Sequence, residues 1–398
     1  IDTPIKELRK NILDVHMCNG NNLSNYIESV CERYNRSSFE ASKWINSLYM
    51  PTPTIIEAAQ ALYSGHNVED ISRNDASAIN LNQAINEIID YSKTNKRKSI
   101  CFITGVPGAG KTLAGLNIAV ERQKTDNNEH AVFLSGNGPL VDVLQEALAR
   151  DDVKRNKVKK TDALRKSREF IQIIHHFRDD AIALESAPFE KVTIFDEAQR
   201  AWDEANLADF MKRKKGKLDF NMSEPEFLIS VMDRHKDWAT IVCLIGGGQE
   251  INKGESAGIS GWFEALKNKF TDWDIYISDK ITEDEYSKGK SFDELLNGLN
   301  YRVEDDLHLS VSLRSFRSEK VASFVKALLD ADKVTAKTLY EEFKEKYPIC
   351  ITRDIDSAKD WIKGKALGTQ RYGLTASSGA KRLRKYGIWV DNKVKATN

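Results

Sequence analysis

The sequence predicts an α/β fold built on a parallel sheet, and two observations indicate it. Short apolar runs recur at 100–103, 131–134, 192–195 and 240–245, and stretches with helical periodicity separate them. Runs of this length are typical of strands that are buried on both faces. Alternation of such strands with helices favours parallel pairing, because each helix returns the chain to the same edge of the sheet. The carboxyl ends of the strands should therefore share one rim, where ligands collect.

A glycine-rich pattern follows the first apolar run. Gly105, then four residues, then Gly110, Lys111 and Thr112 fill the G-x-x-x-x-G-K-[ST] pattern, and 113–119 is typical of a helix. A strand, a glycine turn and a helix start direct backbone N–H groups and the positive helix end at one place, where phosphates bind. We expect Lys111 to reach the β- and γ-phosphates and the Thr112 hydroxyl to hold Mg²⁺; a purely structural turn is the alternative. The expected nucleotide-binding residues are Gly105, Pro107, Gly108, Ala109, Gly110, Lys111, Thr112 and Leu113.

Two acids follow the strand expected at 192–195. Asp196 can hold the Mg²⁺ that bridges the β- and γ-phosphates, and Glu197 can orient and deprotonate the attacking water. Acid pairs also occur at ordinary loops and helix starts. Their position about 85 residues after the glycine pattern, in an alternating chain, favours the functional interpretation. Glu197 makes hydrolysis, and not only nucleotide binding, the expected activity.

Two further segments supply candidates for the same rim. Three glycines and Gln249 follow the strand at 240–245, and the Gln249 amide could sense the γ-phosphate or the attacking water. Arg314 and Arg317 precede a helix expected at 319–329, and each is a candidate arginine finger. Two surface arginines at a helix start are the alternative.

The composition excludes several classes of protein. No apolar run approaches the roughly 18 residues of a membrane span. Five cysteines without a C-x-x-C pair indicate a reducing cytosol and argue against a disulfide framework or structural zinc. The His175-His176 pair lacks metal-ligand spacing. The net charge is zero, but basic clusters at 154–168, 212–217 and 381–385 are either nucleic-acid contacts or solvated surface.

The two ends of the chain carry fewer signals. Helices are expected at 55–63 and 76–91, and Asn82 or Gln83 is a candidate for contact with the adenine base, with a surface amide as the alternative. Strands are expected at 349–352, 372–376 and 388–390, where they would open a second α/β unit.

The motifs together resemble a known family. GVPGAGKT, DEAQ, GGGQ and the run at 309–315, LSVSLRS, resemble motifs I to IV of superfamily 1 DNA/RNA helicases. Longer stretches, among them PTPTIIEAAQALY and VFLSGNGPLVDVLQEAL, are similar to the bacterial schlafen-type DNA/RNA helicase-like family, over about residues 45–390.

The resemblance implies a RecA-like P-loop NTPase with ATP and Mg²⁺ between two lobes and single-stranded nucleic acid across both. It makes Lys111 and Thr112 phosphate and Mg²⁺ ligands, and Asp196 and Glu197 the Walker B pair. It makes Gln249 the motif III glutamine and Arg314 the motif IV arginine. The implied domains are a helical N-terminal region at 1–94, a first RecA-like lobe with motifs I, Ia, II, III and IV at 95–318, and the start of a second, incomplete RecA-like lobe at 319–398.

Three departures from the superfamily pattern are visible. Gly247 replaces the acid of motif III, Ser312 and Leu313 replace the Asn-Tyr of motif IV, and no motif V or VI follows Ile388.

We expect a cytoplasmic, Mg²⁺-dependent ATPase of the helicase or translocase type. It would bind, translocate along or unwind single-stranded or partly duplex DNA or RNA, in phage defence or repair, with a nuclease-like domain or a partner subunit and no membrane. The first alternative is a regulatory NTPase switch that gates a partner or an attached effector without translocation. The second is a domain that binds ATP only to hold an assembly together.

Overall fold

A computed structural model gives the fold of residues 20–34, 55–63, 76–106, 108–125, 129–215, 220–246, 257–282, 286, 294, 296–309, 317–344, 347, 349–366, 372–374, 376 and 380–388, and only these are described. The chain divides into two compact units: the larger is centred on 52–340, and the smaller combines 1–51 with 341–392. None of the described helices is long and apolar enough to cross a membrane.

The larger unit is built on one parallel sheet, as the alternation of apolar runs and helices predicts. Its described strands follow the order β3-β2-β4-β5-β1-β6-β7, and every pairing is parallel. The central strand β1 places Phe102 opposite Cys243 of β5 and Ile277 of β6. The bounds are β1 Lys98–Gly105, β2 Ala131–Ser135, β3 Ile171–Ile173, β4 Val192–Asp196, β5 Ala239–Leu244, β6 Asp274–Ile277, β7 Tyr301–Val303 and β8 His308–Leu309, which pairs with the end of β1.

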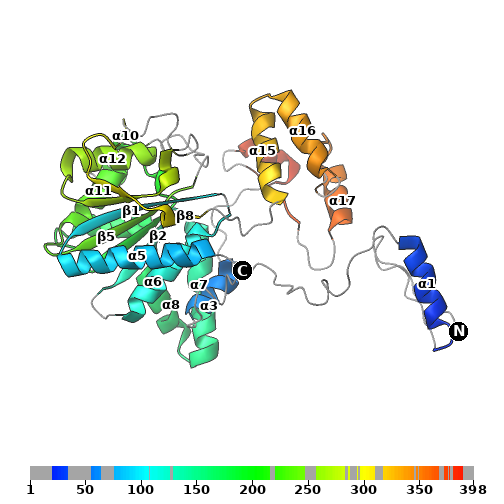
Figure 1. Ribbon diagram of the computed structural model, residues 1–398, viewed down its shortest axis with the longest axis horizontal. Coiled ribbons are helices and arrows are strands. Elements are labelled where there is room, and N and C mark those ends of the chain that lie inside the picture. Colours follow the sequence, from blue (N-terminus) through cyan, green and yellow to red (C-terminus); the bar gives the residue numbers. More distant parts are fainter. Residues whose placement is uncertain are drawn as a thin grey trace. The chain divides into compact units, whose positions relative to one another are not determined.

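Helices cover both faces of the sheet (Figure 1). Alternate residues of β1 enter two separate cores: Phe102 packs on one face and Ile103 on the other. One face is covered by α3 Ile55–Tyr63, α5 Ala76–Asn95, α6 Lys111–Thr125 and α7 Gly138–Asn156, with α8 Lys160–Phe170 against α7. The other is covered by α9 Ile174–Ala183, α10 Glu204–Lys215, α11 Glu224–Asp233 and α12 Gly258–Lys269. The continuous apolar character of the strands is therefore explained by two-sided burial.

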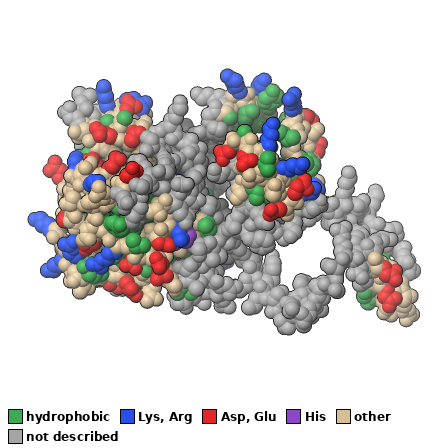
Figure 2. Space-filling view, turned by 45° about the horizontal axis from the view of Figure 1, so that its top comes forward, with side chains coloured by type: hydrophobic (Ala, Val, Ile, Leu, Met, Phe, Trp, Pro, Cys, Tyr) green, Lys and Arg blue, Asp and Glu red, His purple; other side chains and the backbone are tan. Residues whose placement is uncertain are grey.

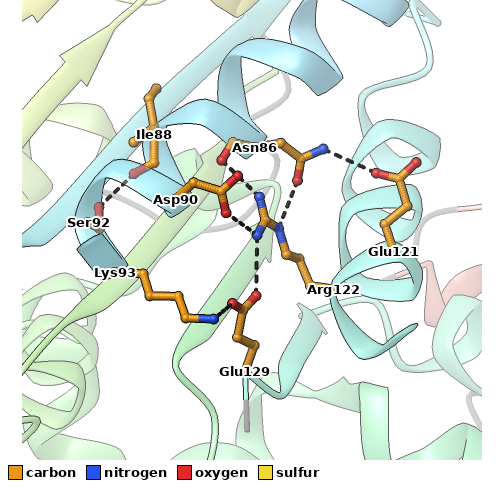
Figure 3. Close-up of polar contacts among 8 residues, drawn as sticks. All are labelled: Asn86, Ile88, Asp90, Ser92, Lys93, Glu121, Arg122 and Glu129. Atoms are coloured by element: carbon orange, nitrogen blue, oxygen red, sulfur yellow. Dashed lines mark hydrogen bonds and ion pairs between the residues drawn. The ribbon is translucent and has the colours of Figure 1, made fainter. Parts of the chain in front are cut away.

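A polar network joins α5 to α6 (Figure 3). The buried Arg122 of α6 pairs with Asp90 of α5 at 2.6 Å and with Glu129 at 3.2 Å, and its Nε donates to the Asn86 amide oxygen at 2.8 Å. Asn86 in turn donates to Glu121 of α6 at 3.2 Å. Removal of one partner would leave a buried charge without its counter-charge. The network therefore holds α5, which precedes β1, against α6, which follows it.

Ion pairs close the amino ends of the strands. Arg97, just before β1, pairs with Asp274 of β6 at 2.8 Å, and Lys98 pairs with Asp233 at 2.7 Å. Asp233 also accepts a hydrogen bond from the indole N–H of Trp273 at 3.0 Å. Lys191, just before β4, pairs with Asp237. Opposite charges therefore neutralise one another along this edge of the sheet.

The described residues outside the sheet are helical or irregular. Before α3 they form α1 Leu23–Tyr34. After β8 they form α15 Arg317–Leu329, α16 Lys333–Phe343, α17 Ile355–Lys365 and the 3-10 helix η4 Lys381–Tyr386, and no strand occurs among the described residues after 316. The prediction of a strand at 349–352 is wrong: Ile351 is 100% exposed, and β-branched residues form strands only where a sheet offers them neighbours. The described parts of 372–376 and 388–390 are also loop, and the remainder lies outside the described residues.

The surface carries both signs of charge. Figure 2 shows Lys and Arg side chains interspersed with Asp and Glu on the face in view, which agrees with the zero net charge of the sequence.

The buried cysteines, Cys101 of β1 and Cys243 of β5, behave as small core side chains, and burial raises the pKa of both thiols.

Candidate active site

The glycine-rich loop begins where β1 meets β8. A side chain at Gly105 would place its Cβ 2.8 Å from the Cβ of Leu309, and the Val106 N–H donates to the Leu309 carbonyl at 3.1 Å. Gly108 and Gly110 have φ values of 81° and 89°, which other L residues rarely adopt. Close approach explains the first glycine, and backbone conformation explains the other two.

Helix α6 begins directly after this loop, at Lys111. The Lys111 ammonium group donates to the carbonyl oxygens of Gly105 and, at 3.2 Å, Val106. The amine therefore lies over the loop, where the first N–H groups of α6 also point. Leu113 lies in the first turn of α6, and Ala109 is buried beside the loop. Pro107 lies outside the described residues.

Asp196 lies at the end of β4 and contacts helix α6, which follows the glycine-rich loop. The Thr112 hydroxyl donates to one Asp196 carboxylate oxygen at 3.1 Å, and the Ser135 hydroxyl at the end of β2 lies 3.4 Å from the other. Burial and the neighbouring Glu197 carboxylate raise the pKa of Asp196 to about 6, against opposing hydrogen bonds from Thr112 and Ser135. A cation here would relieve both causes of that shift.

Glu197 adopts an uncommon backbone conformation. Its φ is +53°, in the left-handed region that a residue with a side chain occupies at a cost. Its carboxylate pairs with Arg200 at 2.6 Å, and about a third of the Glu197 side chain is exposed. Strained backbone of this kind is found where structure fixes a functional side chain in one direction, here at the start of η1 Ala198–Arg200.

Gln199 links two strand ends. Its side chain is buried, and its amide oxygen accepts the Gly246 N–H, just after β5, at 3.0 Å. Gln199 belongs to the DEAQ motif and Ser135 begins a loop that follows the strand at 131–134, but neither is among the residues expected to bind ATP or Mg²⁺. The signal for Ser135 is its place at the end of an apolar run on the rim, and the signal for Gln199 is its position three residues after Asp196.

A second polar group lies between β1, β6 and β8. The Thr104 hydroxyl lies 2.6 Å from the Ser278 hydroxyl and 2.8 Å from Nδ1 of His308. These side chains join the end of β1 to the strand that leads toward Arg314. Arg314 itself, Gln249 and the Arg317 side chain lie outside the described residues.

The segment after Glu197 rests on a buried ion pair. Arg178 of α9 donates to Glu224 of α11 at 3.3 Å, and the other Glu224 oxygen accepts the Trp202 N–H at 3.0 Å. Arg178 also lies 4.4 Å from the ring centre of Phe210. The neighbouring His175 ring packs near Trp202, and burial lowers its pKa. His175 therefore belongs to an aromatic cluster that supports the chain after the two acids.

The candidate adenine contacts are engaged in other bonds. Asn82 donates to Glu121 at 2.9 Å, and Gln83 donates to Glu87 at 2.8 Å. Both amide nitrogens are thus used within α5 and its contact with α6.

The donor set suits Mg²⁺ that also binds phosphate oxygens. The Thr112 hydroxyl and the buried Asp196 carboxylate are oxygen ligands 3.1 Å apart. Within the described ranges no three His, Cys, Asp or Glu side chains gather as metal ligands. One or two carboxylates with phosphate and water are the usual surroundings of Mg²⁺, so these residues fit the ion.

The comparison with protein families agrees with this geometry. Residues 98–398 match the model of the schlafen group 3 DNA/RNA helicase domain, a span that begins at β1 and includes every residue of the site. No curated protein matches the sequence.

Proposed function

Because the chain belongs to the schlafen group 3 DNA/RNA helicase domain family, we propose that it is a Mg²⁺-dependent ATPase whose turnover is coupled to nucleic acid. One observation carries the proposal. Lys111, Thr112 and Asp196 come from two places in the sequence, yet they meet at one strand-end rim beside Glu197. Their chemistry matches that of a triphosphate with a magnesium ion.

The proposed mechanism assigns each side chain one task. Lys111 would leave the loop carbonyls and bind the β- and γ-phosphates. Thr112 and Asp196 would hold Mg²⁺, which, when bound, supplies positive charge to the phosphate oxygens. Glu197 would accept a proton from the attacking water. Gln249 and Arg314 remain proposed contributors, a γ-phosphate sensor and an arginine finger.

Glu197→Gln in the full chain tests hydrolysis. ATP turnover should fall at least about a hundredfold, because a positioned general base contributes about 10² to 10⁴, while ATP binding is kept. The control is Glu185→Gln, a change at an exposed acid, which should leave turnover unaltered. Unchanged turnover in Glu197→Gln would refute the assignment of the base.

Single-stranded DNA and RNA test the coupling. Each is added to the wild-type chain at low salt, where phosphate contacts are strongest, and ATP turnover is measured. A rise with either polymer supports the proposal. Constant turnover across the salt range, with intact ATP binding, would contradict it.

One observation favours the alternative of a nucleotide switch. The Glu197 carboxylate is bound by Arg200 at 2.6 Å, so the base is held away from proton transfer until that pair opens. A switch would hydrolyse ATP slowly without responding to nucleic acid, and Glu197→Gln would hold it in the ATP-bound state. The nucleic-acid titration therefore separates the two functions.

A further inference from the structure

The turn between α7 and α8 concentrates positive charge. Residues 154–160 read KRNKVKK, which places five basic side chains and no acid within seven residues. The whole chain has 59 basic and 59 acidic residues, so its net charge offers no general attraction to a polyanion. A local concentration of this kind therefore requires its own explanation.

The basic side chains of the turn fall into two groups. Arg155 pairs with Asp151 at 2.9 Å and Lys160 pairs with Glu146 at 2.7 Å, both toward the body of the helices. Lys154, Lys157 and Lys159 are exposed, and within the described part of the chain they make no ion pair. The first group holds the turn, and the second presents three ammonium groups to solvent.

The fold does not require lysine at the centre of this turn. Lys157 ends α7 with φ +57°, the left-handed conformation that glycine adopts without cost, and its N–H donates to the Val153 carbonyl at 3.1 Å. The next residue, Val158, is 38% exposed and so adds little to a core. Glycine would satisfy the backbone better, so the backbone conformation does not explain a lysine at this position.

Contacts between α7 and α8 hold the turn in place, and it lies away from the strand-end rim. Ser167 of α8 donates to the Gln145 carbonyl of α7 at 3.2 Å, and Ala163 and Phe170 are buried. Helix α7 begins at the rim, where Asn137 caps it, and its 19 residues run away from the phosphate loop. At 1.5 Å per residue the turn lies about 28 Å from the rim along the helix.

We propose that Lys154, Lys157 and Lys159 of the α7–α8 turn bind the phosphodiester backbone of nucleic acid, at a place separate from the rim that binds ATP. The choice of partner rests on the proposed function. Exposed lysines on a rigid turn suit sequence-independent contact with phosphates, because they neutralise backbone charge and release its counterions without reading bases.

The test combines Lys154→Gln, Lys157→Gln and Lys159→Gln in the full chain. Binding of labelled duplex and of labelled single-stranded DNA is measured by fluorescence anisotropy over a range of salt. Three lost contacts should reduce the slope of log K against log salt by about 2.7 for duplex or about 2.1 for single strand. A form that contacts the turn should lose its own expected amount of slope, and a form that does not contact it should keep its slope. Basal ATP turnover without nucleic acid should stay at the wild-type value.

Two controls separate position from charge. Neutralising the exposed Lys96, Lys236 and Lys267 changes the net charge equally and should leave the slope unaltered. A variant that combines Lys154→Arg, Lys157→Arg and Lys159→Arg should keep the wild-type slope, because a cation is all that the contact requires.

The remaining outcomes overturn the inference. If the wild type binds nucleic acid and the triple variant keeps its slope, the turn is not a contact, while the proposed function stands. Labelled polyglutamate is measured in the same assay. If the triple variant keeps its slope on DNA but loses affinity for polyglutamate, the turn binds acidic protein and not nucleic acid. If the wild type binds no nucleic acid while it hydrolyses ATP, the nucleic-acid part of both proposals fails.

Discussion

The two ends of the parallel sheet have opposite electrostatic character. At the amino end, cations and acids pair: Arg97 with Asp274, and Lys98 with Asp233. At the carboxyl end, two acids adjoin one another at 196–197, and the first of them is buried. The amino end is arranged for stability, and the carboxyl end keeps unfavourable charge and strain that a bound ligand would relieve.

The largest effect is expected from Asp196→Asn, which should separate stability from activity. ATP turnover should fall at least about a hundredfold, because the proposed ion loses its carboxylate. The free energy of unfolding should instead rise by about 1–3 kcal/mol at pH 8, because one unit of pKa shift corresponds to about 1.4 kcal/mol. Denaturant unfolding and a turnover assay measure the two quantities.

The pH dependence sharpens the same prediction. The pKa of Asp196 is raised from 3.8 to about 6, so folding takes up a proton between these values. The penalty of its charge is fully present above pH 6 and absent below pH 3.8, so this carboxyl makes the protein less stable as pH rises. The difference in unfolding free energy between wild type and Asp196→Asn should shrink as the pH falls from about 6 to 3.8. A constant difference would contradict the burial of this charge.

Gly105→Ala should disrupt the packing at the carboxyl ends of the strands by a steric clash. The new methyl group meets Leu309 at 2.8 Å, so β8 must move from β1, and the loop with it. We expect a loss of about 2–3 kcal/mol in unfolding free energy, as for overpacked cores, and weaker ATP binding. The matched control is Gly136→Ala, on a neighbouring rim loop with nothing within 4 Å, which should be neutral. Calorimetric ATP titration of both variants compares them.

Asp233→Ala should affect only the amino end. It removes the carboxylate that pairs with Lys98 and accepts the buried Trp273 N–H, while Lys98 keeps its bond to the main-chain carbonyl of residue 233. The free energy of unfolding should therefore fall by about 1–2 kcal/mol. Turnover and ATP affinity should match the wild type within error. Asp272→Asn, at an exposed acid on the same edge, is the control for charge alone. A tenfold loss of turnover in Asp233→Ala would contradict the separation of stability, at the amino ends of the strands, from activity, at their carboxyl ends.

The smallest effect is expected from Arg200→Gln. Its pair with Glu197 is partly exposed, so stability should change by less than about 1 kcal/mol. Turnover without nucleic acid should rise a few-fold, because Glu197 no longer has to leave an ion pair. Lower turnover would mean that Arg200 positions the base. Single-turnover assays at saturating ATP resolve a change of this size.

Much of the sheet was predictable because each strand carries its own local signal. The apolar runs at 131–134 and 192–195 became β2 and β4, and the expected helices at 55–63 and 76–91 became α3 and α5, with α5 extending to Asn95. The false strand at 349–352 has the same local signal without a sheet to pair with. Local pattern therefore identifies strands only where tertiary structure supplies a neighbour.

The site was predictable in its residue types and less so in its contacts. Lys111, Thr112 and Asp196 follow from a motif and a strand end, and the structure brings the last two within 3.1 Å. The left-handed backbone at Glu197 and the bond from Gln199 to Gly246 depend on packing between distant segments. No spacing in the sequence encodes such contacts, so they required the fold.

The close contact of Leu309 with Gly105 joins the glycine-rich loop to the chain that continues toward Arg314. A partner that displaced β8 would disturb the glycine-rich loop, because Leu309 packs directly against Gly105. If ATP binds this loop as proposed, thermodynamic reciprocity would require ATP to weaken the binding of that partner by the same factor. The absence of a side chain at Gly105 would in this way couple the proposed ATP site to a partner bound at β8.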